Sequence, residues 1–160
     1  MTAKSKTVLQ NSVYESPIGP LEIIIRDQAL CSIHFLNEST DDTNYVPLNS
    51  NIRKQLDEYF DHQSTTFDLP LSPEGTPFQL KVWKELQNVP YGTTITYGEL
   101  SEQIGDTKAV RAVGRANGQN PIPIIIPCHR VIGQNQKLTG YAGGIERKKW
   151  LLRHEGALLL

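Results

Sequence analysis

The composition of this 160-residue chain changes abruptly near residues 72–77, a run of turn-forming residues. Residues 1–75 carry 11 Asp and Glu against 5 Lys and Arg, a net charge of −6. Residues 76–160 carry 6 Asp and Glu against 11 Lys and Arg, a net charge of +5, together with 10 of the 12 glycines. A chain of this length forms one ordinary domain or two compact ones. The break predicts two domains, residues 1–75 and residues 76–160.

The overall net charge of −1 hides this asymmetry. A basic domain beside an acidic one indicates that the basic part binds an anionic partner such as nucleic acid. The alternative is that the two oppositely charged parts simply attract each other. Charge alone leaves both interpretations open.

The remaining composition is typical of a globular protein in a reducing compartment. Hydrophobic residues make up 38% and charged residues 21%, which argues against wholesale disorder, collagen and coiled coil. No apolar run approaches the roughly 20 residues of a membrane helix, and residues 1–6 lack the apolar core of a secretory signal. The two cysteines lie 97 positions apart and form no disulfide framework. We therefore expect a cytoplasmic protein, or a nuclear one in a eukaryote, with no membrane partner.

Hydrophobic periodicity in the first domain predicts strands followed by a helix. Turn-forming residues 16–20 and 27–29 separate three strands, which we place near Val13, over residues 21–26 and over residues 30–36. One face of a short helix is then marked by apolar residues at i, i+4, i+7 and i+8. These residues are Ile52, Leu56, Tyr59 and Phe60.

No reactive site is expected in the first domain. Cys31 and His34 resemble half of a metal site, but residues an odd number apart in a strand point to opposite faces. No matching pair lies nearby, so we expect no metal and interpret Cys31 as a buried apolar residue. Residues 37–50 are polar and are expected to form a loop.

Three helices are predicted at the start of the second domain. Residues 77–89 begin with a proline that suits a first helical turn, and apolar residues then recur at helical spacing. Residues 97–104 predict a second helix that a glycine ends. Asp106 or Thr107 can cap a third helix that reaches about Asn117. Two short helices joined by a tight turn are the outline of a helix-turn-helix unit.

The third predicted helix carries cations along one face. Lys108, Arg111 and Arg115 recur at i, i+3 and i+7, which is the electrostatic footprint expected for DNA phosphates. Val110 and its neighbours at helical spacing occupy another face, where Gly114 leaves room for a close approach. The alternative is an ordinary solvated helix face.

Residues 120–133 contain the candidate nucleophile and its candidate base. Three prolines within seven residues fix φ and predict a stiff extended segment that ends at Cys128. A thiol attacks only as a thiolate and needs a base or a positive charge nearby, so His129 is the candidate base. Adjacent residues rarely face each other, and we expect contact through one water. The base needs an orienting acid, and the candidates include Glu155, at the end of a basic helix predicted over residues 145–153.

In the order and spacing of its motifs, the second domain resembles the O6-alkylguanine-DNA alkyltransferases. The central motif is Pro127-Cys128-His129-Arg130-Val131. The other matching segments are residues 76–78, 89–92, 96–100, 111–114, 120–123, 141–144 and 151–156.

The resemblance implies an α+β protein of two domains. Residues 1–75 match the family only in residues 16–21, and the fold implied there is a ribonuclease H-like α/β domain. Residues 76–160 are implied to form a helical, winged helix-turn-helix domain that carries the active cysteine.

The resemblance also implies direct DNA repair without a metal or an organic cofactor. Cys128 attacks the alkyl carbon on O6 of guanine, or on O4 of thymine, and keeps the alkyl group irreversibly as a thioether. His129 takes the thiol proton through a water, and Glu155 orients the imidazolium. Tyr97 donates a hydrogen bond or a proton to the departing guanine, and Asn120 holds the turn around the cysteine.

The implied partner is double-stranded DNA, bound through its minor groove with the damaged base flipped out of the stack. Arg111 fills the vacated stack, and Ala112 and Gly114 permit the close approach. Further DNA contacts are assigned to Lys108, Arg115 and Gln134, and the guanine pocket to Val131, Tyr141, Ala142 and Gly143. We expect a monomer that can bind cooperatively along DNA.

Three other functions stay open at this stage. A non-reactive protein that binds alkylated bases commonly has Trp in place of the cysteine, so Cys128 argues against it. A cysteine hydrolase would use Cys128, His129 and Glu155 for repeated acyl transfer and would need an oxyanion hole. A transcription regulator would need a sensor or a dimerisation element, and neither is visible.

Overall fold

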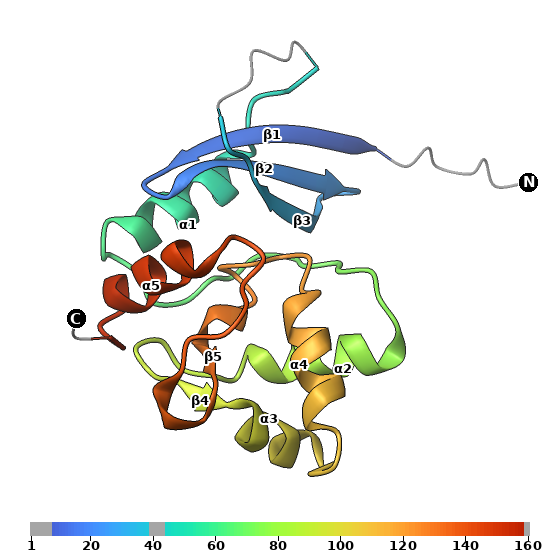
Figure 1. The fold of residues 1–160 in the computed structure, drawn as a ribbon. Helices are drawn as coiled ribbons and strands as arrows, with labels where there is room; N and C mark the ends of the chain where they lie inside the picture. The colour runs from blue at the N-terminus through green and yellow to red at the C-terminus, as the bar shows by residue number, and fades with distance from the viewer. Residues whose placement is uncertain (1–7, 39–43, 159–160) are drawn as a thin grey trace, which may run out of the picture. The chain divides into compact units, whose positions relative to one another are not determined.

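The computed structural model describes residues 8–38 and 44–158, and it forms two compact units that divide between Pro73 and Glu74 (Figure 1). The predictions for residues 1–6, and for residues 39–43 of the expected polar loop, lie outside the described residues. Each unit has a core of its own.

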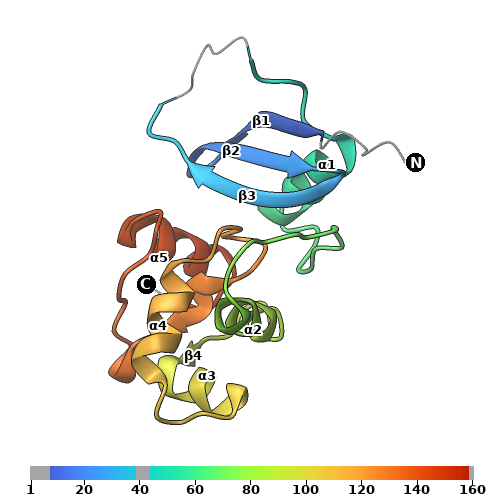
Figure 2. The ribbon, with the colours of Figure 1, turned by 90° about the vertical axis from the view of Figure 1, so that its right-hand side faces the viewer.

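The first unit is a three-stranded antiparallel meander with one helix against the sheet (Figure 2). Its strands are β1 (Leu9–Ser16), β2 (Gly19–Arg26) and β3 (Ala29–Phe35), and its helix is α1 (Ser50–Phe60). The predicted strands and helix are therefore confirmed. Asp27 and Gln28 have φ angles of 49° and 70°, which is the left-handed geometry that suits a two-residue hairpin turn.

The core of this unit lies between the sheet and α1. The four predicted apolar residues of α1 are buried, and Tyr14 of β1 stacks on Phe60 with a ring-centroid distance of 6.1 Å. The hydroxyl of Tyr14 donates to Asp57 Oδ1 at 2.6 Å. Cys31 is only half-buried, so its assignment to the core is wrong. It lies on the strand face opposite the buried Leu30.

The second unit is mainly helical and contains a short parallel pair of strands in which Ile95 lies opposite Val131. Its elements are α2 (Pro77–Leu86), β4 (Ile95–Thr96), α3 (Tyr97–Ile104), α4 (Val110–Gly118), the 3-10 helices η1 (Cys128–Arg130) and η2 (Gln134–Gln136), β5 (Val131–Ile132) and α5 (Ile145–His154).

The starts of α2 and α3 are defined by side chains that satisfy free backbone N–H groups. Thr76 and Gln79 form a reciprocal capping box at α2, and Thr96 and Glu99 form a second one at α3. Gly105 ends α3 in the left-handed conformation, with a φ of 93°. The predicted boundaries of α3 are confirmed.

The third predicted helix begins later than expected. Asp106 caps a turn rather than the helix, because its Oδ1 accepts from Lys108 N at 3.1 Å and its carbonyl accepts from Ala109 N at 3.1 Å. The helix α4 starts at Val110 without a side-chain cap. Lys108 therefore precedes the helix, and the predicted three-cation helical stripe is reduced to Arg111 and Arg115.

The proline-containing segment before Cys128 is folded into turns, so the prediction of an extended arm is wrong. Ile126 N donates to Ile122 O at 2.9 Å, and Ile125 N donates to Pro123 O at 2.9 Å. Ile124 has a φ of 74°, which is rare for a β-branched residue. A proline fixes only its own φ, so the residues between the prolines remain free to turn. The isoleucines of this segment are buried, and their burial favours the folded backbone over an extended one.

None of the helices in residues 8–38 and 44–158 is long and apolar enough to cross a membrane.

Candidate active site

Cys128 lies at the first position of η1. Its side chain is buried, with 4% of the residue surface exposed. The turn before it is fastened by Asn120, whose Nδ2 donates to Ile126 O at 2.7 Å and whose Oδ1 accepts from Ile122 N at 3.0 Å. The buried Asn117 of α4 donates from Nδ2 to Cys128 O at 3.4 Å. Two asparagines thus fix the backbone that presents the thiol.

His129 and Arg130 converge on one carboxylate at the end of α5. His129 Nε2 lies 2.8 Å from Glu155 Oε2. Arg130 Nε donates to Glu155 Oε1 at 2.8 Å, and Arg130 Nη2 donates to Oε2 at 3.1 Å. A further Arg130 nitrogen, Nη1, donates to Val89 O at 2.7 Å. The two-point contact of Arg130 with the carboxylate fixes its plane and therefore the direction of the bond to His129.

The charges in this cluster are set by competition between burial and hydrogen bonding. Burial alone would raise the pKa of Glu155, but its contacts with His129 and Arg130 lower that pKa to about 2. Glu155 is therefore ionised at neutral pH and can only accept hydrogen bonds. Burial lowers the pKa of His129 below its usual value of 6.5, against the opposing effect of Glu155. His129 is accordingly neutral at pH 7.

This arrangement selects one tautomer of His129. Because Glu155 accepts, the proton lies on Nε2 and the lone pair lies on Nδ1. Nδ1 is buried and has no hydrogen-bond partner within residues 8–38 and 44–158. A neutral imidazole with a free, buried lone pair is a competent general base.

Burial raises the pKa of the Cys128 thiol to about 11, although a hydrogen bond from Asn120 and the charge of Lys148 act in the opposite direction. The resting thiol is therefore protonated, and it becomes a nucleophile only when a base removes its proton. The cluster supplies such a base in His129. Chemically, the site can form a covalent bond between Sγ and an electrophilic carbon.

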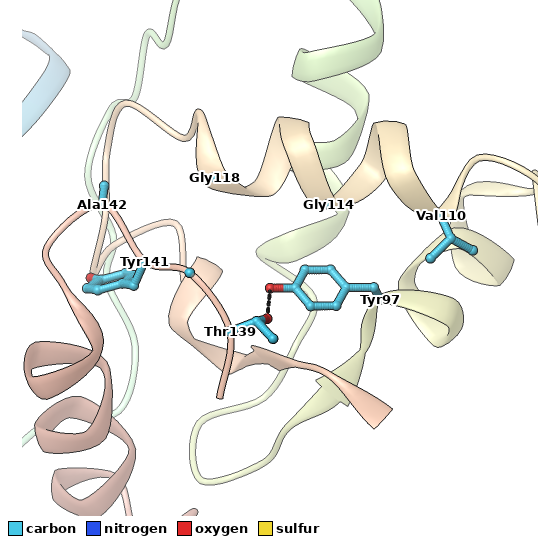
Figure 3. Close-up of a pocket in the computed structure, with 8 residues that line it drawn as sticks. Tyr97, Val110, Gly114, Gly118, Thr139, Tyr141 and Ala142 are labelled. Carbon is cyan, nitrogen blue, oxygen red and sulfur yellow. Dashed lines mark hydrogen bonds between the residues drawn. The ribbon is translucent and has the colours of Figure 1, made fainter. Parts of the chain in front are cut away.

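A pocket of about 490 Å³ lies between α4 and the segment before α5 (Figure 3). Four of its lining residues were predicted site residues, namely Tyr97, Gly114, Tyr141 and Ala142. The other lining residues are Val110, Gly118, Thr139 and Gly140. The ring of Tyr97 lies beside Gly114, where an added Cβ would be 3.6 Å from Tyr97 Cδ1. A Cβ at this position would be in ordinary van der Waals contact with the tyrosine ring, so the ring lies close to the backbone of α4.

Two predicted substrate residues, Val131 and Gly143, are not among the residues that line this pocket. Val131 is fully buried in β5, and Gly143 O accepts from Arg147 Nη1 at 3.1 Å. Tyr141 lies close enough to the reactive cluster that its pKa is raised, first by burial and then by the charges of Cys128 and Glu155.

The predicted DNA-binding residues lie on the surface. Arg111, Ala112 and Arg115 are exposed on α4, and Lys108 is exposed just before it. Gln134 is exposed at the start of η2. Within the part of the chain that the structure describes, the side chains of Arg111 and Arg115 have neither an ion-pair partner nor a hydrogen-bond partner.

The residues at this site that were not predicted include Arg130, Lys148 and Thr139. Lys148 is fully buried and donates to Val131 O at 2.7 Å and to Thr139 O at 2.9 Å. Burial lowers the pKa of Lys148 to about 8, while Cys128 raises it. A signal for Lys148 exists in the sequence, because Lys148, Leu151 and Glu155 recur at i, i+3 and i+7 on the buried face of α5.

No group of three or more His, Cys, Asp or Glu side chains suited to a metal ion occurs among residues 8–38 and 44–158.

Comparison with known proteins gives consistent matches over both units. Residues 9–73 match the family described as 6-O-methylguanine DNA methyltransferase, ribonuclease-like domain, and residues 77–157 match the corresponding DNA binding domain. A methylated-DNA--protein-cysteine methyltransferase from Methanosarcina acetivorans is 46% identical over 154 residues, which cover 91% of this chain and 97% of that protein.

Solved structures from Mycobacterium tuberculosis are similar as well. The crystal structure of its O6-methylguanine methyltransferase superposes with a TM-score of 0.83 at 45% identity and covers 94% of both chains. The structure of M. tuberculosis OGT in complex with DNA has a TM-score of 0.83 at 46% identity and covers 92% of this chain and 93% of that one.

Proposed function

Because the chain belongs to the 6-O-methylguanine DNA methyltransferase family, we propose that Cys128 is the residue that receives the alkyl group. Like the methylated-DNA–protein-cysteine methyltransferases to which it is similar, the chain repairs DNA by transferring an alkyl group to one of its own cysteines. The observation that carries the choice of Cys128 is the buried base beside it: His129 is neutral and oriented by Glu155. The other cysteine, Cys31, donates from Sγ to Ala29 O at 3.6 Å and has no other hydrogen bond among residues 8–38 and 44–158.

The proton of the thiol passes to His129 Nδ1 through one water. Adjacent residues of a 3-10 turn do not face each other, and a buried polar atom such as Nδ1 is commonly satisfied by an ordered water. The imidazolium that forms is stabilised by the ionised Glu155, whose position is held by Arg130. Asn120 keeps the backbone turn that presents Sγ.

The alkyl transfer itself is a single displacement. A bond forms between Sγ and the alkyl carbon, the bond from that carbon to O6 breaks, and its electron pair stays on the guanine. Overall the thiol loses one proton and the released guanine gains one, with Tyr97 donating to the base as negative charge builds on it. The thioether has no good leaving group, so the protein acts once.

The substrate is O6-alkylguanine in double-stranded DNA, with O4-alkylthymine as a second substrate. The damaged base flips through the minor groove into the pocket, which costs a few kcal/mol of stacking and pairing. Arg111 occupies the vacated position, and Ala112 and Gly114 let α4 approach the groove. Lys108, Arg115 and Gln134 contact the DNA. Backbone groups near Val131 and in the loop of Tyr141, Ala142 and Gly143 read the guanine. The exposed, unpaired Arg111 and Arg115 support this orientation of α4.

The fold assignments follow the family. We propose that residues 1–75 form a ribonuclease H-like domain and that residues 76–160 form a winged helix-turn-helix domain with both DNA-binding and transfer activity. The protein acts as a monomer, binds cooperatively along DNA, and works in the compartment that holds the DNA, the cytoplasm of a prokaryote or the nucleus of a eukaryote.

Peptide mapping tests the assignment of the acceptor. After incubation with an oligonucleotide duplex that contains O6-methylguanine, mass spectrometry is expected to find one added methyl group on the peptide of Cys128 and none on that of Cys31. The variant Cys31→Ser is a matched control and is expected to react at the wild-type rate. Methylation of Cys31, or an unmodified Cys128 after complete repair, would overturn the assignment.

A further inference from the structure

The loop before α5 reaches the hydroxyl of Tyr97 through Thr139. Thr139 Oγ1 lies 2.8 Å from Tyr97 Oη, and either oxygen can donate the hydrogen bond between them (Figure 3). Both residues line the 490 Å³ pocket. The hydroxyl of Tyr97 therefore meets a second hydroxyl at the wall of the pocket that is proposed to receive the base.

The backbone and the methyl group of Thr139 are both held by neighbouring residues. Its carbonyl accepts from the buried Lys148 Nζ at 2.9 Å, and the same ammonium group donates to Val131 O at 2.7 Å. The loop between these two carbonyls is closed by a hydrogen bond from Gly133 N to Lys137 O at 2.7 Å. A Cβ atom added to Gly133 would lie 3.4 Å from the methyl group of Thr139. The methyl group thus packs beside Gly133, and the hydroxyl is directed to Tyr97.

Tyr97 depends on this partner for its orientation. Its ring lies against Gly114 of α4, which restricts the ring plane but leaves the phenolic O–H free to rotate about its bond. A hydroxyl can donate one hydrogen bond and accept others. When Thr139 donates to Tyr97 Oη, the O–H of Tyr97 can donate to a different acceptor. Accepting a hydrogen bond also polarises the Tyr97 O–H and makes it a stronger donor.

We propose that Thr139 is a positioning residue for alkyl transfer: it donates to Tyr97 Oη and so directs the Tyr97 proton to the departing base. This inference rests on the proposed role of Tyr97 as the donor to that base. Thr139 touches neither the thiol nor the alkyl group and acts only through Tyr97. Lys148 supports it by fixing the backbone of Thr139 to the strand that follows Cys128.

A double-mutant comparison separates this role from general support of the fold. The measured quantity is the single-turnover rate constant of methyl transfer from an O6-methylguanine duplex at saturating DNA. Thr139→Val removes the hydroxyl at nearly constant shape and is expected to slow transfer about 10-fold, the value of one ordinary hydrogen bond. Thr139→Ser keeps the hydroxyl and is expected to stay within about 2-fold of wild type. In a Tyr97→Phe background, Thr139→Val is expected to have no further effect.

A second readout checks that the thiol and its base are intact. Iodoacetamide alkylates Cys128 with iodide as the leaving group, and iodide needs no proton. We expect all of these variants to react with iodoacetamide at the wild-type rate. Thr65→Val makes the same chemical change at an exposed position of the first unit and is expected to alter neither rate.

Each failure has a distinct meaning. If the wild-type protein transfers no methyl group, the proposed function fails. If Tyr97→Phe transfers at the wild-type rate, the role of Tyr97 fails, and the inference about Thr139 fails with it. If Tyr97→Phe is slow while Thr139→Val is not, only the inference about Thr139 is overturned. A 10-fold effect of Thr139→Val that persists in the Tyr97→Phe background, or a parallel loss of iodoacetamide reactivity, would also overturn it.

Discussion

Proton affinities at Cys128 and His129 explain why these two residues need each other. Burial holds the thiol proton tightly, with a pKa of about 11, and burial also keeps His129 neutral. A protonated thiol is a poor nucleophile, and a neutral imidazole is a ready base. Glu155 makes the transfer between them favourable because its charge stabilises the imidazolium. In the proposed mechanism the thiolate of Cys128 therefore forms only when His129 accepts the thiol proton.

This division of roles predicts the pH dependence of transfer. At saturating DNA, the single-turnover rate constant of the wild-type protein is expected to be nearly constant between pH 7 and 9. It should fall in acid with a midpoint below the usual His value of 6.5, because protonated His129 cannot accept a proton and its pKa is lowered. The rate constant falls in acid and not in base because the neutral, unprotonated form of His129 is the active one.

A variant at His129 provides the contrast. In His129→Gln the thiolate must form by direct ionisation, so the rate is expected to rise about tenfold per pH unit toward the thiol pKa. A wild-type rate that also rises tenfold per unit between pH 7 and 9 would contradict the role of His129 as the base.

Sequence reasoning at the residue scale proposed Cys128, His129 and Glu155 together with one support, Asn120, but missed the other supports. Cys128, His129 and Glu155 carry distinctive side chains, and a thiol that needs a base and an acid restricts the choice. Arg130 was named only as part of the matched motif, and its two-point contact with Glu155 depends on the tertiary approach of η1 to the end of α5. Thr139 is an ordinary residue in a loop, and no periodic pattern marks it.

At the scale of elements, α4 connects the surface proposed to bind DNA with the pocket. Its buried face contains Val113, Ala116 and Asn117, and Asn117 reaches the carbonyl of Cys128. Its glycine positions 114 and 118 line the pocket, and Arg111 and Arg115 face outward. A single nine-residue helix thus touches the reactive turn, the proposed base pocket and the solvent.

The proposed position of Arg111 in the base stack predicts a substrate-dependent defect. Arg111→Ala is expected to slow methyl transfer from a saturating duplex by about 10-fold or more. Flipping the base costs a few kcal/mol, and without the Arg111 side chain nothing fills the gap that the flipped base leaves in the stack. Transfer from free O6-benzylguanine requires no flipping and is expected to change little. Both rates can be measured in single-turnover reactions.

Arg115→Ala is the matched control, since it removes the same charge one turn further along α4. It is expected to weaken duplex binding in a salt-dependent way, while the rate constant at saturating DNA is retained. Equal losses for Arg111→Ala with the duplex and with the free base would contradict the stacking role.

Element boundaries show how far sequence reasoning reaches. The ends of α3 follow from Thr96, Glu99 and Gly105, whose local chemistry is sufficient to set them. An Asp carboxylate can accept a backbone N–H at the start of a helix or in a turn, so its presence does not distinguish the two. Asp106 caps a turn. Residues 122–126 were misassigned for a different reason: burial of the isoleucines, a tertiary effect, overrides the local preference of prolines for extended backbone.

At the scale of the whole molecule, charge follows the division of the chain. Composition changes at residues 72–77, and the two compact units divide between Pro73 and Glu74. The reactive cysteine, its base and the exposed arginines of α4 all belong to the basic unit. A net charge of −1 for the whole chain is therefore a poor guide to its partner, since association with DNA depends on the local field.

Single-use transfer to Cys128 is tested by a count of repaired bases per protein molecule. The protein is incubated with an excess of duplex that contains O6-methylguanine, and the loss of the lesion is followed until it stops. We predict a plateau at one repaired guanine per protein, reached together with complete methylation of Cys128. Lesion loss that continues past one per protein, or a plateau reached with Cys128 unmodified, would contradict the account.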